Sequence, residues 1–286
     1  MPSTVFLRSA VPRSHASSAV LGEERMGAGV AVGADRILTA HYLVLGASSI
    51  EVAAFDGQPR RVRRSSLDHE SGLALLQVDG PPLRPVRLSP SREARPGWPV
   101  FLLTCTSERE RRSATGHISR VGPFEAFWEY MLDAAIMTTA LNPGLAGAPL
   151  FDQQARLLGI VSLGLTAVGR FSLAIPSDLY ADRLDVLLGQ ADGTRPQRAW
   201  LGFYPQEFDG GVILTGVGEG GPAERAGLQR GDLILSVDGE TVTGLRMLYQ
   251  AAWRRHPGDT LGLQVLRDSA IRVVEVVGGD RERFYA

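Results

Sequence analysis

Residues that could take part in hydrolysis lie at three places in the first 150 residues of the chain. His41 follows a short apolar run, Asp68 and His69 precede another, and a glycine-rich turn, NPGLAGAPL, occupies 142–150. Nucleophilic hydrolysis of a peptide bond requires a hydroxyl that attacks, a histidine that takes its proton and a carboxylate that orients the imidazole. The turn, however, carries Ala146, whose side chain has no attacking atom.

The segments that must position these groups have the pattern of short β-strands. Each is rich in β-branched or aromatic residues and is bounded by Gly, Asp, Pro or Ser, which favours an antiparallel barrel or sandwich. The arginine clusters at 60–64 and 109–112 are predicted to lie in solvated loops. The predicted strands are 4–9, 27–32, 36–40, 49–55, 73–78, 99–104, 116–121, 155–164 and 170–175.

Leucines at helical spacing follow the last of these strands and predict a helix over 177–190, capped by Ser177 or Asp178. The polar, Gly- and Pro-containing stretch 191–198 indicates a linker. We therefore expect a first domain at 1–190 and a second at 199–280. The second domain includes a helical segment, LRMLYQAAWRR, and a closing strand, IRVVEVV.

The composition is that of a globular protein. The chain has 286 residues, of which 44% are hydrophobic and 21% charged, and its net charge of -1 excludes a global field that attracts nucleic acid or an anionic membrane. The single cysteine, Cys105, excludes an intrachain disulfide and is predicted to be buried. No apolar stretch has the length of a signal peptide or a membrane span, so a cytoplasmic location is expected, or a periplasmic one if a leader has been removed.

Six motifs in order, at matching spacing, resemble the HtrA family, in which a trypsin-like protease domain precedes a PDZ domain. The resemblance implies a mostly β fold, with a double β-barrel followed by an α+β PDZ domain. The motifs are GAGVAV (27–32), ILTAHYLVLGA (37–47), DGQPRRVRRSSLDHESGLALLQV (56–78), NPGLAGAPL (142–150), LLGIVSLG (157–164) and FSLAIPSD (171–178).

Compared with the family pattern, all three triad positions carry a different residue. Tyr42 stands where the family has its histidine, Gly72 where it has aspartate and Ala146 where it has serine. Glycine offers no acceptor, so we expect that nothing at this position holds a histidine tautomer. The backbone amides around Gly144 and Ala146 remain as an oxyanion-type site. We therefore expect a chain that is not an enzyme and acts by binding, as a scaffold, an assembly subunit or a regulator.

Two other hypotheses stay open. A local shift could return His41 to the site and give an active serine endopeptidase with an unrecognised nucleophile. Ser162 and Thr139 are hydroxyls near the cleft, but neither has an evident base partner, and both are expected to be strand or cleft-lining residues. A metal site could form from imidazoles and carboxylates, but the spacing matches no ligand pattern, so no metal and no cofactor is expected. The residues considered for such a site are His41, Asp68, His69 and His117.

The second domain carries the peptide-binding features implied by the resemblance. A peptide adds as a strand to the edge of a sheet, and its terminal carboxylate meets backbone N–H groups of a turn, here Trp200, Leu201, Gly202 and Phe203. Leu248 and Ala252 on the following helix either line this groove or pack in the core. The expected partners are protein or peptide C-termini, and family members imply a possible trimer; nucleic acid and membrane insertion are not expected.

Overall fold

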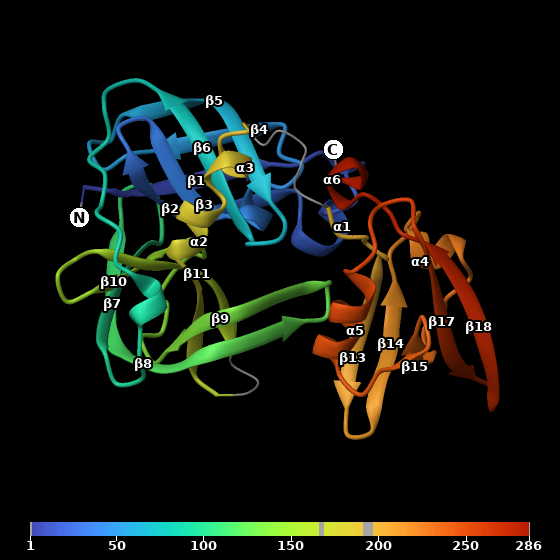
Figure 1. Ribbon diagram of the computed structural model, residues 1–286. Helices are drawn as coiled ribbons and strands as arrows, with labels where there is room; N and C mark the ends of the chain where they lie inside the picture. Colours follow the sequence, from blue (N-terminus) through green and yellow to red (C-terminus); the bar gives the residue numbers. More distant parts are fainter. Residues whose placement is uncertain (1, 166–168, 191–196, 286) are drawn as a thin grey trace. The chain divides into compact units, whose positions relative to one another are not determined.

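The computed structural model describes residues 2–165, 169–190 and 197–285 (Figure 1). Two compact units divide the chain. The first comprises Met1–Pro123 and Leu132–Ala191, and the second comprises Phe124–Met131 and Asp192–Ala286. The division near residue 191 falls at the start of the predicted linker 191–198, most of which lies outside the described residues. The segment Phe124–Met131, which the sequence assigned to the first domain, belongs to the second unit.

A closed barrel of six antiparallel strands begins the first unit, in the order β1-β2-β3-β6-β5-β4. Alternate side chains point inward, so that Leu7, Leu38 and Leu75 are fully buried. Register is set by pairs such as Leu38 with Leu75. The strands are β1 (Thr4–Ala10), β2 (Glu24–Gly33), β3 (Arg36–Ala40), β4 (Ser49–Ala53), β5 (Pro59–Asp68) and β6 (Leu73–Asp79).

The second barrel of this unit also has six strands, in the order β10-β11-β12-β9-β8-β7. Leu102, Ile136 and Leu150 lie in its buried core. The two closed barrels confirm the mostly β, double-barrel prediction. The strands are β7 (Pro99–Cys105), β8 (Arg111–Ala126), β9 (Tyr130–Thr138), β10 (Pro149–Asp152), β11 (Leu157–Leu165) and β12 (Phe171–Pro176); short helical turns elsewhere in the unit are α1 (Ser18–Leu21), η1 (His41–Leu43) and η2 (Ser91–Glu93).

The arginine cluster 60–64 lies in β5, so the prediction of a loop there was wrong. Arg60 is buried, and its guanidinium donates to the Asp56 carboxylate and to the Pro81 carbonyl. Arg61 and Arg63 are exposed. A strand whose outward positions are arginines has no hydrophobic alternation, which is the signal that sequence patterns depend on.

The predicted helix 177–190 is interrupted at Arg183, which separates α2 (Asp178–Asp182) from α3 (Leu184–Leu187). The Arg183 guanidinium donates to both carboxylate oxygens of Asp68, over 2.9 and 2.7 Å. Asp68 is 1% exposed at the end of β5, so its carboxylate is buried with this partner. This ion pair joins the last helical turns of the unit to its first barrel.

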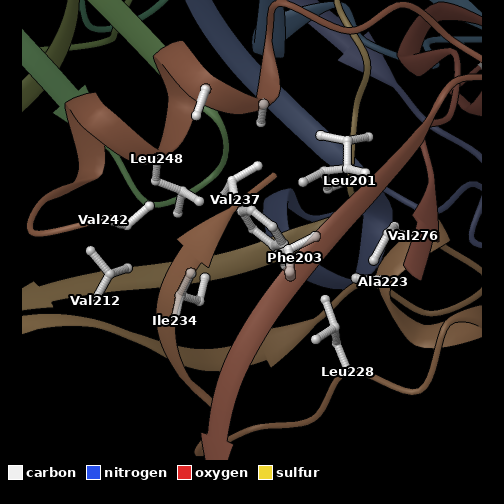
Figure 2. Close-up of a cluster of buried hydrophobic side chains, with 14 of the residues drawn as sticks. Leu201, Phe203, Val212, Ala223, Leu228, Ile234, Val237, Val242, Leu248 and Val276 are labelled. Carbon is white, nitrogen blue, oxygen red and sulfur yellow. The ribbon is translucent and has the colours of Figure 1, made fainter. Parts of the chain in front are cut away.

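The second unit is built on a sheet in the order β13-β14-β15-β17-β18, with the short β16 beside β15. Its hydrophobic core contains Leu201, Phe203 and Leu248 (Figure 2). No helix within the described ranges is long and apolar enough to cross a bilayer. The elements are β13 (Phe203–Phe208), β14 (Gly211–Val217), β15 (Leu233–Val237), β16 (Glu240–Thr241), β17 (Thr260–Arg267), β18 (Ala270–Val277), α4 (Pro222–Arg225), α5 (Leu245–Ala252) and α6 (Arg281–Phe284).

Replacing Asp68 by alanine should lower the free energy of unfolding by about 3 kcal/mol, because the Arg183 guanidinium loses its buried partner. Urea denaturation followed by tryptophan fluorescence measures the change. Glu23→Ala is the control, since Glu23 and Arg13 form an ion pair of 4.0 Å with side chains that are 61% and 91% exposed. Equal midpoints for the two variants would contradict a stabilising role for the buried pair.

Candidate functional site

The glycine-rich turn at 142–147 is held by bonds from both barrels. Ala28 on β2 donates its N–H to the Ala146 carbonyl over 2.7 Å, and Thr104 on β7 donates its hydroxyl to the Leu145 carbonyl over 2.8 Å. Gly147 has a φ of 81°, and a Cβ there would lie 2.0 Å from the Ala28 carbonyl oxygen. Only glycine fits at this position, so the turn has a fixed conformation.

The proposed oxyanion amide of Gly144 is engaged within the turn itself. Its N–H donates to the Asn142 side-chain oxygen over 3.2 Å, and the Asn142 amide group donates to the Leu145 carbonyl over 2.9 Å. The Asn142 backbone N–H in turn donates to the Ser172 hydroxyl. A substrate carbonyl would have to replace the Asn142 oxygen before it could accept from Gly144.

Tyr42 links the two barrels across this region. It lies on η1 in the first barrel, and its hydroxyl donates to the Ser162 carbonyl on β11 of the second barrel over 2.5 Å. Burial raises the pKa of Tyr42 to about 12, and the bond to Ser162 opposes this rise. The phenol is therefore neutral and able to donate throughout the physiological pH range.

His41, one residue earlier, faces Gly72. Its Nδ1 lies 3.2 Å from the Gly72 carbonyl oxygen, and its backbone N–H donates to the same oxygen over 2.9 Å. A carbonyl oxygen can only accept, so Nδ1 is assigned as the protonated ring nitrogen. Gly72 therefore supplies an acceptor through its backbone, which corrects the expectation that nothing at this position holds a tautomer.

The residues considered for a metal site do not gather together. His41 and His69 approach edge to face with ring centroids 5.4 Å apart, but Asp68 is bound to Arg183 and His117 is exposed on β8. Over the ranges that the structure describes, no group of three or more His, Cys, Asp or Glu side chains could hold a metal ion.

The remaining candidates in this unit sit in strands or beside them. Ser162 lies on β11 and is 9% exposed, whereas the Thr139 hydroxyl accepts from the His117 N–H. Cys105 is buried as expected, and burial raises the pKa of its thiol to about 11, which keeps it unreactive at neutral pH.

In the second unit, three consecutive backbone N–H groups converge on one carboxylate. Leu201, Gly202 and Phe203 donate to the side chain of Glu129, over 2.9, 2.6 and 3.3 Å. These amides belong to the turn predicted for peptide binding, and that role stays a prediction. Glu129 was not predicted, because nothing in its surroundings, FWEYM, indicates a long-range contact. Gly202 has a φ of 72°, the left-handed conformation that lets these amides point to one side.

The other side chains predicted for the groove are buried. Leu248 and Ala252 on α5 are 0% and 1% exposed and lie in the same core cluster as Leu201 and Phe203, so their packing is that of core residues. Trp200 is 6% exposed and its ring contacts that of Phe284.

Comparison with known proteins assigns both units to families. Residues 27–160 match the trypsin-like peptidase domain, and residues 199–277 match the PDZ domain. Relatives named "Probable periplasmic serine endoprotease DegP-like" are 30% identical over 90% of this chain, both in Halomonas elongata and in Ectopseudomonas mendocina. The chain spans 57% and 56% of the length of these two relatives.

Solved structures share the fold across both units. The HtrA-type protease AlgW with decapeptide has 24% identity and a TM-score of 0.60 over 97% of this chain and 95% of its own. The serine endoprotease from Yersinia pestis has 23% identity and a TM-score of 0.60 over 97% of this chain and 94% of its own. This is a trypsin-like serine protease fold with a PDZ domain. The chain belongs to the HtrA family.

These findings correct two expectations. The prediction that the chain is not an enzyme is contradicted, because the relatives are named serine endoproteases and the matched domain is a peptidase domain. Unusual residues at Tyr42, Gly72 and Ala146 are therefore no sufficient ground for excluding activity. The expected cytoplasmic location finds no support either, since the relatives are named periplasmic.

The Tyr42 hydroxyl should stay protonated until about pH 12, and its bond to Ser162 should persist to the same limit. Burial raises the pKa of Tyr42 in the folded protein above 10, the value of the unfolded side chain. The bond therefore contributes fully to the free energy of unfolding below pH 10, and this contribution is lost as the pH rises through 12. Ultraviolet difference titration of the native protein and Tyr42→Phe measures this. If the phenolate band that disappears in the variant titrates near pH 10, Tyr42 is not buried as described.

Proposed function

We propose that this chain acts in the periplasm as an HtrA-type serine endopeptidase that recognises peptides through its PDZ domain. Peptide recognition is supported by one observation above all. The N–H groups of Leu201, Gly202 and Phe203 all donate to the carboxylate of Glu129. A peptide C-terminus presents the same chemical group. The named relatives support the endopeptidase step and the location.

The peptide would add to β13, which is an edge strand of the sheet. Its terminal carboxylate would take the place beside the turn, and its last side chain would pack near Trp200, Leu201, Gly202 and Phe203. In this proposal α5 lies beside the peptide, because a bond from the Leu245 N–H to the Glu207 carboxylate holds it to β13. Leu248 and Ala252 support α5 from the core.

For the endopeptidase step, we assign His41 as the general base. Its support is the Nδ1 contact with the Gly72 carbonyl, which performs the orienting task that a carboxylate performs in the usual triad. Ala146 has no hydroxyl, so the attacking group must come from another residue. Ser162 on β11 is the first hydroxyl to test, because its own carbonyl is bound to Tyr42.

Replacing His41 by alanine should reduce endopeptidase turnover about a hundredfold or more, because the proton acceptor is lost. Fluorogenic peptides report turnover, and a serine-reactive phosphonate followed by mass spectrometry locates the nucleophile. His117→Ala is the matched control, since His117 is exposed on β8. Ser162→Ala should abolish labelling if Ser162 is the attacking residue.

The endopeptidase proposal fails if the native protein shows neither turnover nor phosphonate labelling. It also loses its assigned base if His41→Ala and His117→Ala have equal activity. Peptide recognition is tested separately, by binding of peptides to the native protein.

The family resemblance also leads us to propose that the chain forms a homo-oligomer, with a trimer as the specific expectation. Sedimentation velocity over a range of protein concentrations would measure the assembly. A single species at the monomer mass of 30.8 kDa would contradict it.

A further inference from the structure

We infer that Glu129 is a built-in ligand of the PDZ domain, which occupies the carboxylate-binding turn and must leave before a peptide C-terminus can bind. The inference rests on the proposed peptide-binding function of this domain. It concerns the hairpin tip, defined as residues 124–131, which joins β8 to β9 and belongs to the second unit.

The Glu129 side chain satisfies the turn as a terminal carboxylate would. Both of its oxygens are used, one by the Leu201 N–H and the other by the N–H groups of Gly202 and Phe203. Glu129 is 4% exposed, so water does not share these donors. The site that a peptide terminus requires is therefore already filled.

Helices α5 and α6 fasten the hairpin tip on two sides. On α5, the Tyr249 hydroxyl donates to the Ala126 carbonyl over 2.5 Å and accepts from the Glu129 N–H over 3.3 Å. On α6, Arg281 donates to the Glu129 carbonyl over 3.0 Å and to the Trp128 carbonyl over 3.2 Å. The hairpin tip is held by its backbone as well as by the Glu129 carboxylate. The backbone bonds keep the Glu129 side chain beside the turn at Leu201 to Phe203.

A further ion pair and a ring contact complete the attachment. Arg246 on α5 binds Glu125 over 2.5 Å, and the Phe127 ring contacts that of Tyr204 on β13, with centroids 6.3 Å apart. Tyr204 lies on the edge strand that a peptide would extend. The hairpin tip thus contacts the turn, the helix and the strand that form the groove.

The same contact carries costs that make it displaceable. Glu129 has a φ of 55°, a left-handed conformation that is unfavourable for a residue with a Cβ. Burial raises the pKa of Glu129, and its amide bonds and Arg281 offset only part of that rise. A carboxylate that loses this much hydration gives a smaller net stabilisation than its hydrogen bonds suggest.

Competition with an internal ligand lowers the affinity for an external peptide. The apparent affinity is the intrinsic affinity multiplied by the fraction of molecules in which Glu129 has left the turn. A tethered group has an effective concentration of about a millimolar, so even a modest contact keeps most molecules closed. We expect Glu129→Ala to bind a free-carboxyl peptide about tenfold more tightly than the native chain. Glu129→Gln, which keeps the length but not the charge, should give a smaller gain.

The experiment uses the full chain and a fluorescein-labelled pool of random decapeptides with free C-termini, with fluorescence anisotropy as the readout. The same pool with amidated C-termini shows whether the carboxylate is recognised. Glu219→Gln, at an exposed acid of the same unit, is the matched control and should bind as the native chain does. Circular dichroism verifies that each variant is folded.

Tighter binding of the free-carboxyl pool by Glu129→Ala, with no gain for the amidated pool, supports the inference. Equal and measurable affinity of the native chain and Glu129→Ala overturns it and leaves the proposed peptide recognition intact. Absence of binding by every variant overturns both.

Discussion

A carboxylate that leaves water must find donors, and in this protein the donors lie far away in the sequence. Asp68 binds Arg183, 115 residues later, and Glu129 binds the turn at Leu201 to Phe203, more than 70 residues later. Each contact fastens a separate segment: the interrupted helix after the second barrel in one case and the hairpin tip in the other. Because an unpaired buried charge is strongly unfavourable, these bonds stabilise the observed positions of the two segments.

The region between the barrels follows a related constraint. A one-residue difference in position separates His41, which faces the Gly72 carbonyl, from Tyr42, which reaches the Ser162 carbonyl. On a tight helical turn, adjacent residues point in different directions, so the two rings serve different neighbours. The imidazole is oriented by backbone, and the phenol bridges the barrels. This local geometry is the basis of the general-base role proposed for His41.

Much of the fold was predictable from sequence because most strands carry alternating or continuous apolar residues between turn signals. β5 was missed because its outward positions are arginines, and β9, with Asp133 in its middle, was missed as well. The turn at Trp200 to Phe203 could be proposed from the sequence because its motif is local. Glu129 could not be found, since a single glutamate between aromatic residues has the same appearance whether it is solvated or bound to amides of another segment.

The left-handed conformation at Glu129 has a consequence for the order in which the protein folds. Local preference at the apex of this hairpin favours glycine or asparagine, and glutamate there has to be held in place by its distant amide partners. The apex should therefore take its native shape late, after the sheet of the second unit has assembled. Until then the strands of the β8–β9 hairpin are ordered and its tip is not. The contact between Glu129 and the turn at Leu201 to Phe203 is therefore among the last to form.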